Sequence, residues 1–372
     1  MKGIALIPYR YRKIITPIVC VMASLMASAQ VNDTTEIKPN FAVYPAIAYS
    51  PETSFQLGVM AFLVFNKNPD TTQSSRPNLI TPKIIYSIRN QLTIGVDAQF
   101  YLKNNLRWLM DSEFLNFPDY FFGVGTGTSP DTKELYTRQY FNTNGSLMKS
   151  RNSIHFGGLL FDIEYDDIQD IKKNGLLATE HPIGIDGGRV MGLGLGFVMD
   201  SRNHNLYPTK GKYIRIGALW YGPMTGSQYQ YSNYSFDYRQ YQRLFNDNSV
   251  LAFQFLTNLN YGDVPFFKLS KLGGKRNLRG IENSNLYTDK NAIYGQIEGR
   301  QHLFWRIGGV LFAAVGQVFD SFSEFDVENM RATYGIGGRF QVMKHQPLNV
   351  RLDLGFSDNG QHAFYFAIQE AF

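Results

Sequence analysis

Apolar and polar residues alternate along many stretches of this 372-residue chain. Between residues 348 and 356 every second residue is apolar, and the residues between them are Asn349, Arg351, Asp353 and Gly355. A period of two is the pattern of a β-strand with one apolar and one polar face. The same alternation runs through 91–100, 251–260 and 331–342. The pattern predicts an all-β protein.

The length of the alternating stretches separates two kinds of β-protein. Strands of soluble β-sandwiches commonly have about 5 or 6 residues. The stretches here extend to about 10 or 12 residues, which is the length a tilted strand needs to cross a bilayer. Their polar faces carry Arg and Asp together, as expected for a lumen. We therefore expect a transmembrane antiparallel β-barrel, with membrane lipid outside and a polar interior.

The strands can be counted from Phe41 onward. About sixteen alternating stretches begin near residues 41, 55, 79, 91, 106, 136, 152, 189, 211, 229, 249, 291, 307, 330, 347 and 360. An even number returns both ends of the barrel to the periplasmic side. Connections of unequal length predict periplasmic turns and extracellular loops. The short ones include 89–90 and 103–105, and the long ones 66–78, 116–135, 166–188 and 263–290.

The first 29 residues have the organisation of a secretory signal peptide. Four basic residues precede an apolar stretch at 14–25, and Ala27-Ser28-Ala29 forms an A-x-A cleavage site. A signal-anchor helix is the alternative, but this stretch is shorter than the ~20 residues of a bilayer span. A lipoprotein would use Cys20, which lacks the small residue expected before it. We expect cleavage after residue 29, a short periplasmic segment at 30–40, and a barrel at 41–372.

Composition narrows the classes of partner and cofactor. The signal peptide holds four of the 36 basic residues and no acidic ones, so 32 basic residues remain against 31 acidic ones. A nucleic-acid partner would need a clustered basic excess and is not expected. Cys20 is the single cysteine, so the mature chain has no disulfide and no thiolate metal site. No cofactor or metal is predicted.

Two segments carry motifs beyond the alternation. Residues 194–211 include Asp200, Arg202, Asn203, Pro208 and Gly211, and such residues suit a compact capped turn between strands. Residues 272–281 read Leu-Gly-Gly-Lys-Arg-Asn-Leu-Arg-Gly-Ile and end in Leu278, Arg279, Gly280 and Ile281. Taken alone, the second motif fits a solvated loop arginine as well as a loop that folds inward.

Together with residues 49–53, these motifs resemble the BamA/TamA family of outer-membrane proteins, the bacterial surface-antigen barrels, including members fused to patatin lipases. The resemblance extends from about residue 41 to the end of the chain. It implies that the loop 263–290 folds into the lumen, where Arg279 pairs with Glu298 on the polar face of the next strand. Family members commonly add a second acid in an F-x-D-x-G pattern. Ala314 stands at that place here, so the anchor is single or takes its second partner from elsewhere.

Two features mark the first and last strands. Pro45 lies within the first strand, and proline is tolerated mainly at edges or bulges. It therefore indicates either a weak seam against residues 360–372 or a bulge without a function. At the other end, Phe364, Phe366 and Ile368 are spaced by two and Phe372 is the last residue, which resembles the recognition signal of outer-membrane barrels. Glu370 interrupts this column and is expected at the membrane interface.

Three classes of function remain to be compared. The resemblance implies insertion, assembly or translocation of proteins at the cell outer membrane. Family machines carry periplasmic POTRA domains that hold clients, whereas a short segment at 30–40 is expected before the barrel here. We therefore expect an assembly-machine or periplasmic partner to handle clients. The alternative is a passive or partly plugged pore, or a structural subunit of a larger complex. An enzyme is not expected, because the six histidines show no paired spacing and no G-x-S-x-G motif or other catalytic residue is recognised.

Overall fold

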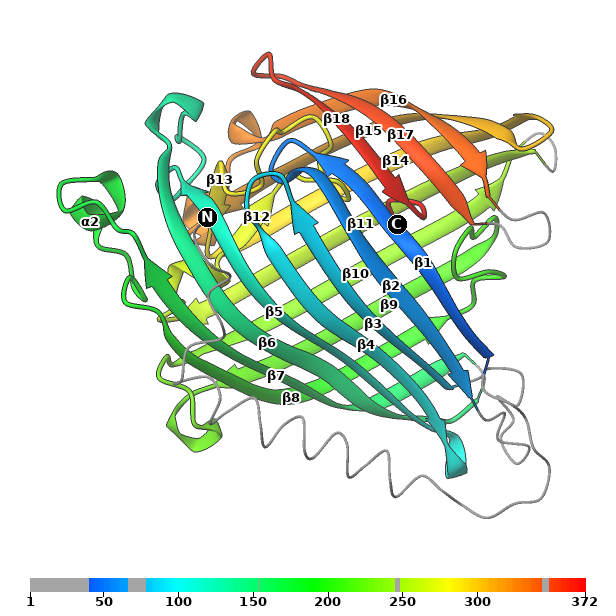
Figure 1. Cartoon of the computed structure of the whole chain (residues 1–372), viewed down its shortest axis with the longest axis horizontal. Coiled ribbons are helices and arrows are strands. Elements are labelled where there is room, and N and C mark those ends of the chain that lie inside the picture. The colour runs from blue at the N-terminus through cyan, green and yellow to red at the C-terminus, as the bar shows by residue number, and fades with distance from the viewer. Residues whose placement is uncertain (1–39, 66–77, 153, 245–247, 343–347) are drawn as a thin grey trace. The chain divides into compact units, whose positions relative to one another are not determined.

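The computed structural model describes residues 40–65, 78–152, 154–244, 248–342 and 348–372. Sixteen strands form one closed antiparallel barrel (Figure 1). They are β1 (Asn40–Ser50), β2 (Ser54–Phe65), β3 (Asn78–Ser87), β4 (Leu92–Leu102), β5 (Leu106–Phe121), β6 (Glu134–Ser150), β7 (His155–Gln169), β8 (Gly188–Asp200), β9 (Gly211–Tyr221), β10 (Tyr231–Arg243), β11 (Ser249–Gly262), β14 (Asn291–Phe304), β15 (Ile307–Phe319), β16 (Arg331–Gln341), β17 (Asn349–Ser357) and β18 (His362–Ile368).

The predicted all-β barrel of about sixteen strands is confirmed, and each barrel strand begins within three residues of its expected start. Each strand pairs with its neighbour in sequence, except where β11 pairs with β14 and where β1 meets β18 to close the barrel. Two short strands, β12 (Ser270–Leu272) and β13 (Tyr287–Asp289), form a separate hairpin between β11 and β14. The signal peptide and periplasmic segment predicted before residue 40 lie outside the described residues.

The helical elements are short and lie in connections. They are α2 (Leu176–Glu180), η1 (Lys103–Asn105), η2 (Pro130–Thr132), η3 (Pro223–Thr225), η4 (Phe266–Lys268), η5 (Phe322–Glu324) and η6 (Val327–Asn329). Over the ranges that the structure describes, no helix has both the length and the apolar character needed to span a bilayer.

The alternation in sequence becomes the two faces of the wall. On β8, the apolar side chains of Leu193, Leu195 and Phe197 are exposed on the outer surface, and glycines stand between them. On β7, Asp162 and Glu164 are buried on the inner face. Side chains of successive strand residues point to opposite faces, so the period of two gives an apolar outside and a polar lumen.

The strand order assigns each connection to one end of the barrel. We call the end that carries 263–290 the loop end, and the opposite end the turn end. The tight turn at 89–90 lies at the loop end, whereas 103–105 lies at the turn end. Length therefore gave the wrong end for 89–90. The long connection predicted at 66–78 falls mainly on 66–77, which lie outside the described residues. Asn90, with φ of 60°, closes the tight turn from the left-handed region that asparagine tolerates.

Candidate functional site

The connection between β11 and β14 folds into the lumen. Gly273 and Gly274 have φ of 107° and 95°, which a residue with a Cβ rarely adopts, so the chain can turn sharply after β12. The apolar side chains that follow are almost completely buried and pack against inward residues of β14 and β15. The buried loop residues are Leu272, Leu278, Ile281 and Leu286, and the wall residues are Ala292, Tyr294, Ala314 and Val318. Burial of this apolar surface holds the loop inside.

Arg279 lies at the centre of this contact, with 1% of its surface exposed. Its Nη2 donates a hydrogen bond to Glu298 Oε1 on β14. Its Nη1 donates to Asp353 Oδ2 on β17 at 2.7 Å. The guanidinium also lies over the ring of Phe312, 3.7 Å from its centroid. The structure thus brings Arg279 and Glu298 together, as the family resemblance implied, and adds a second acid.

That second acid is Asp353 on β17. The family pattern would place it on β15, at the position that Ala314 occupies here. Ala314 is one of the small residues against which the loop packs, so its methyl group supplies apolar contact and no charge. The missed residue was visible as part of the polar face at 349–355. Local alternation predicts that a residue lies on the lumen face, but it does not predict which strand lies opposite the loop. The contact between Asp353 and Arg279 could therefore not be predicted from the sequence around Asp353.

Further arginines extend the anchor into a network. Asp353 also accepts hydrogen bonds from Arg339 Nη1 at 2.6 Å and Arg351 Nη1 at 2.7 Å. Glu298 accepts one from Arg300 Nε at 2.8 Å. An unpaired buried charge is strongly unfavourable, so each of these side chains depends on the others. The network connects the loop with β14, β16 and β17.

Two glycines let the loop backbone touch the wall. Gly280 has φ of 132°, and a Cβ built there would lie 2.7 Å from backbone atoms of Phe356. A Cβ on Gly355 would lie 2.3 Å from the carbonyl oxygen of Arg279. Tyr365 on β18 completes the contact, because its hydroxyl accepts from Gly280 N at 3.3 Å and donates to Ile281 O at 3.0 Å. The close approach of the backbones therefore requires Gly280, and the buried carboxylates require the charge of Arg279.

The Asp200 motif forms the β8–β9 turn at the turn end. Arg202 binds Asp200 through two hydrogen bonds of 2.9 Å. The Asn203 side-chain oxygen accepts from the backbone N–H groups of Thr209 and Lys210 at 3.0 and 3.1 Å. Pro208 is buried, and Gly211 with φ of 103° approaches the Ser201 carbonyl. The motif residues thus meet each other within one compact turn, and none of them is in the Arg279 anchor.

The seam between β1 and β18 is short. The two strands are paired at one position, Tyr49 with Phe366. Antiparallel register then sets Ile368 opposite Ile47, and β18 ends there. Residues 40–46 of β1 extend beyond the end of β18, as Figure 1 shows where the red strand stops beside the blue one. Pro45 lies in this extension with its ring exposed on the outer face.

The last residues turn away from the seam. Gln369 has φ of 75°, and Glu370 then accepts hydrogen bonds from Arg339 Nε at 2.7 Å and Asn349 Nδ2 at 2.8 Å. Phe372 packs in the lumen against Tyr241 and Ala252. The outward column of Phe364 and Ile368 therefore does not continue to Phe372. Our expectation of Glu370 at the membrane interface was wrong, because lumen-facing arginines draw the carboxylate inward.

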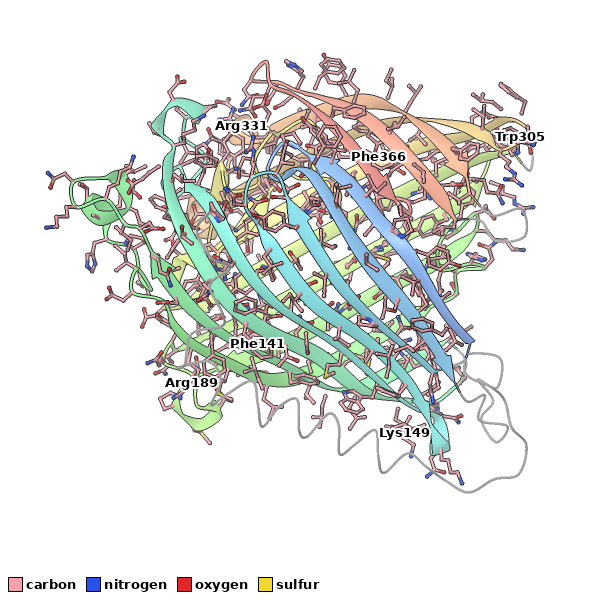
Figure 2. The ribbon with its side chains drawn as sticks, in the orientation of Figure 1. Phe141, Lys149, Arg189, Trp305, Arg331 and Phe366 are labelled. Carbon is pink, nitrogen blue, oxygen red and sulfur yellow. The ribbon has the colours of Figure 1, made fainter. Side chains whose placement is uncertain are left out.

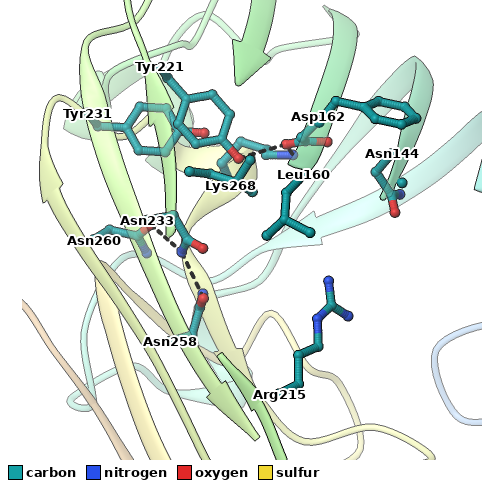
Figure 3. Close-up of a pocket in the computed structure, with 13 residues that line it drawn as sticks. Asn144, Leu160, Asp162, Arg215, Tyr221, Tyr231, Asn233, Asn258, Asn260 and Lys268 are labelled. Atoms are coloured by element: carbon teal, nitrogen blue, oxygen red, sulfur yellow. Dashed lines mark hydrogen bonds and ion pairs between the residues drawn. The ribbon is translucent and has the colours of Figure 1, made fainter. Parts of the chain in front are cut away.

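A cavity of about 260 Å³ remains beside the folded loop (Figure 3). Lys268 lies at its edge and binds Asp162 at 2.8 Å and Glu164 at 3.1 Å on β7, which is a second attachment of the loop. Burial acts to lower the pKa of Lys268, but the two carboxylates outweigh it and hold the pKa above its usual value. Arg215 points into the cavity from β9. The lumen is thus divided into a side filled by the loop and a more open side.

No cluster of three potential metal ligands occurs in the part of the chain that the structure describes.

Residues 131–372 match the Omp85 superfamily domain. No curated protein matches the chain. BamA from Haemophilus ducreyi lacking POTRA domains 1–3 is similar in fold, with a TM-score of 0.63 and 12% identity over 95% of this chain and 78% of that one. CdiB from Acinetobacter baumannii has a TM-score of 0.57 and 12% identity, with 90% of this chain and 60% of that one covered. CdiB from Escherichia coli has a TM-score of 0.59 and 11% identity, with 91% of this chain and 68% of that one covered.

Proposed function

Since this chain belongs to the Omp85 superfamily, we propose that it is an outer-membrane barrel that assists the insertion, assembly or translocation of other proteins, together with a partner. The matched domain covers residues 131–372, and the likeness to BamA and CdiB barrels supports an insertion or translocation family. The observation that carries the proposal is the short seam between β1 and β18.

An exposed strand edge is a template for pairing with another strand. Within the membrane, backbone N–H and C=O groups without partners are costly, because no water is there to bind them. Residues 40–46 of β1 have no partner in β18, and their outward side chains Phe41 and Val43 are apolar and exposed on the outer surface. A client strand that adds to this edge would satisfy the backbone groups by β-augmentation.

The test is to lock the seam with a disulfide. Tyr49→Cys with Phe366→Cys joins the two residues that face each other across it. Val59→Cys with Ile84→Cys is the matched control, because this pair faces across β2 and β3. Directly opposed residues in antiparallel strands are close enough for such a bond. The proteins are placed in phospholipid vesicles with a urea-denatured eight-stranded outer-membrane barrel as the client, and its folding is followed by gel mobility.

We expect the wild type and the oxidised control to accelerate folding of the client, and the oxidised seam variant to do so only after reduction. Acceleration that persists with the seam locked would refute the role of the seam. No acceleration by the wild type, with or without proteins that copurify from native outer membranes, would refute assistance of insertion.

A passive pore is the second candidate function, and the cavity of about 260 Å³ beside the loop favours it. The loop anchored by Arg279 argues against wide passage. Vesicle swelling in small sugars separates the two functions. Rapid swelling with the wild type would support the pore, whereas no swelling supports the barrel plugged by its loop.

A further inference from the structure

A second, smaller cavity of about 120 Å³ lies at the turn end of the barrel. Three elements form most of it: the β8–β9 turn with Tyr207 and Thr209, the β14–β15 hairpin with His302 and Arg306, and β16 with Arg339. A water occupies about 30 Å³ in the liquid. The cavity therefore has room for roughly four waters, which is also enough for one tetrahedral oxyanion.

Arg339 provides a donor that the protein does not satisfy. Its side chain is buried, with 5% of the residue exposed. Its Nε donates to Glu370 at 2.7 Å and its Nη1 to Asp353 at 2.6 Å. Its Nη2 has no hydrogen-bond partner among the residues that the structure describes. Nitrogens of other lumen arginines, such as Arg300 Nη1 and Arg351 Nε, also lack a partner among the described residues. Of these three arginines, Arg339 is the one that lines the cavity. Because a buried donor without an acceptor is unfavourable, Arg339 would gain from an acceptor that enters the cavity.

Several other polar side chains of the cavity can also donate hydrogen bonds. Arg306 stacks beside the Trp305 ring, and its Nη1 lies 3.4 Å from the carbonyl oxygen of Val342. Its guanidinium makes no ion pair with a carboxylate in the described residues. The Thr209 hydroxyl accepts from Asn203 Nδ2 at 2.9 Å, so its own hydrogen is available to donate. Among the described residues that line the cavity, none is Asp or Glu.

We propose that this cavity binds a phosphate group. Two guanidinium groups and the hydroxyls of Tyr207 and Thr209 supply donors from three elements, and a dianion or monoanion supplies the acceptors. The planar fork of arginine matches the oxygens of phosphate, with hydrogen bonds that charge makes stronger. None of the described residues that line the cavity belongs to β1 or β18, and the site does not depend on the insertion activity proposed above.

The position of the β14–β15 hairpin suggests one source of the phosphate. Phe304 and Trp305 at its tip are exposed, Trp305 at 69%, and Figure 2 shows Trp305 at one extremity of the barrel. Aromatic residues of membrane barrels gather at the headgroup level. A phospholipid headgroup is therefore within reach of Arg306. Free phosphate or a small phosphate ester is the other source with the same chemistry.

Calorimetric titration of the delipidated, detergent-solubilised protein tests the proposal and separates the sources. The probes are inorganic phosphate and dihexanoyl phosphatidylethanolamine below its micelle concentration, with chloride as the reference anion. We expect saturable binding of at least one probe. Arg306→Gln should weaken it by about tenfold or more, because a charge-assisted contact is lost. Tyr207→Phe, which removes one hydroxyl and keeps the ring, should weaken it by a smaller factor.

Lys210→Gln is the matched control, because Lys210 is an exposed cation of the same turn that does not line the cavity. Binding of the lipid analogue alone identifies a headgroup site, and binding of inorganic phosphate alone identifies a site for a small phosphate compound. The proposal is overturned if neither probe binds at about 10 mM, where a Kd of even ~1 mM would be seen. It is equally overturned if Arg306→Gln and Lys210→Gln weaken binding to the same extent.

Discussion

Tyr49 of β1 faces Phe366 of β18, and among the described residues this is the one position at which the first and last strands are paired. In contrast, β17 and β18 are paired at seven positions, from Val350–Ile368 to Phe356–His362. Regions with few backbone hydrogen bonds open at lower free energy than the rest of a structure.

The seam should therefore exchange its amide hydrogens first. In lipid nanodiscs, we expect amides of residues 40–50 and 362–368 to exchange at least about tenfold faster than those of β6 and β7, which corresponds to an opening free energy about 1.4 kcal/mol lower. Hydrogen–deuterium exchange with mass spectrometry measures this. Equal protection of the seam and of β6 would contradict a weak joint.

Arg279 and Glu298 should behave as a coupled pair. We expect Arg279→Ala to destabilise the barrel by about 3–5 kcal/mol, because it leaves buried carboxylates without a partner. Glu298→Ala should be at least as damaging, since Arg300 loses the same acceptor. The double variant should lose about 1–3 kcal/mol less than the sum of the two single losses. Urea unfolding in vesicles gives the three values.

Glu282→Ala is the control for this cycle, because Glu282 is an exposed residue of the same loop and should change stability by no more than about 0.5 kcal/mol. Additive losses at Arg279 and Glu298 would show that the two side chains act independently.

Much of the barrel was predictable because alternation is a local property. Each strand carries its own period of two, so the starts of β5 or β14 could be read without knowledge of their neighbours. The inward loop was predictable from the Arg-Gly motif by resemblance, and its burial follows from Leu278 and Ile281.

What escaped prediction depends on how distant strands are set side by side. Asp353 reaches Arg279 across 74 positions of sequence, and only the closed barrel brings β17 to the loop. Phe372 continued the aromatic spacing in sequence, but the arginines that draw Glu370 inward come from other strands. The tight turn at 89–90 shows a similar limit, because connection length does not report which end of the barrel a turn occupies.

Asp353 should matter more than a lumen acid that has a single arginine partner. It accepts hydrogen bonds from three guanidinium groups, those of Arg279, Arg339 and Arg351. Asp353→Asn leaves these cations with less negative charge, so we expect a loss of about 3–5 kcal/mol in the free energy of unfolding. Asp237→Asn is the control, because among the described residues Asp237 has one arginine partner, Arg239, besides a hydrogen bond from Gln254. This substitution should cost about 1 kcal/mol. Similar losses for the two variants would count against a central role for Asp353.

The hairpin within the loop should be sensitive to pH. Burial, with smaller contributions from Asp320 and Glu324, raises the pKa of Asp289 to about 6. A raised carboxyl pKa favours the folded state when the group is protonated. The stabilisation is therefore complete below about pH 4 and is lost as pH rises through 6. This difference between the pKa of Asp289 in the folded and unfolded states corresponds to about 2.7 kcal/mol, which partial solvation reduces to about 1–2 kcal/mol.

Asp289→Asn should remove this dependence. At pH 7.5 we expect slower amide exchange at 287–290 in the variant than in the wild type, whereas at pH 4 the two should agree once the intrinsic exchange rates are corrected. Faster exchange in the variant at pH 7.5 would mean that the Asp289 carboxylate stabilises the hairpin, which is the opposite sign.

The loop anchor also has a consequence for the order in which the chain assembles. Arg279 and Gly280 find their partners 19, 74 and 85 residues later in the sequence, on β14, β17 and β18. The loop is therefore synthesised before any of these partners. Contacts between such distant positions form late, because the intervening chain must be ordered first. The complete set of contacts that docks the loop can therefore form only after the last strand has joined the wall.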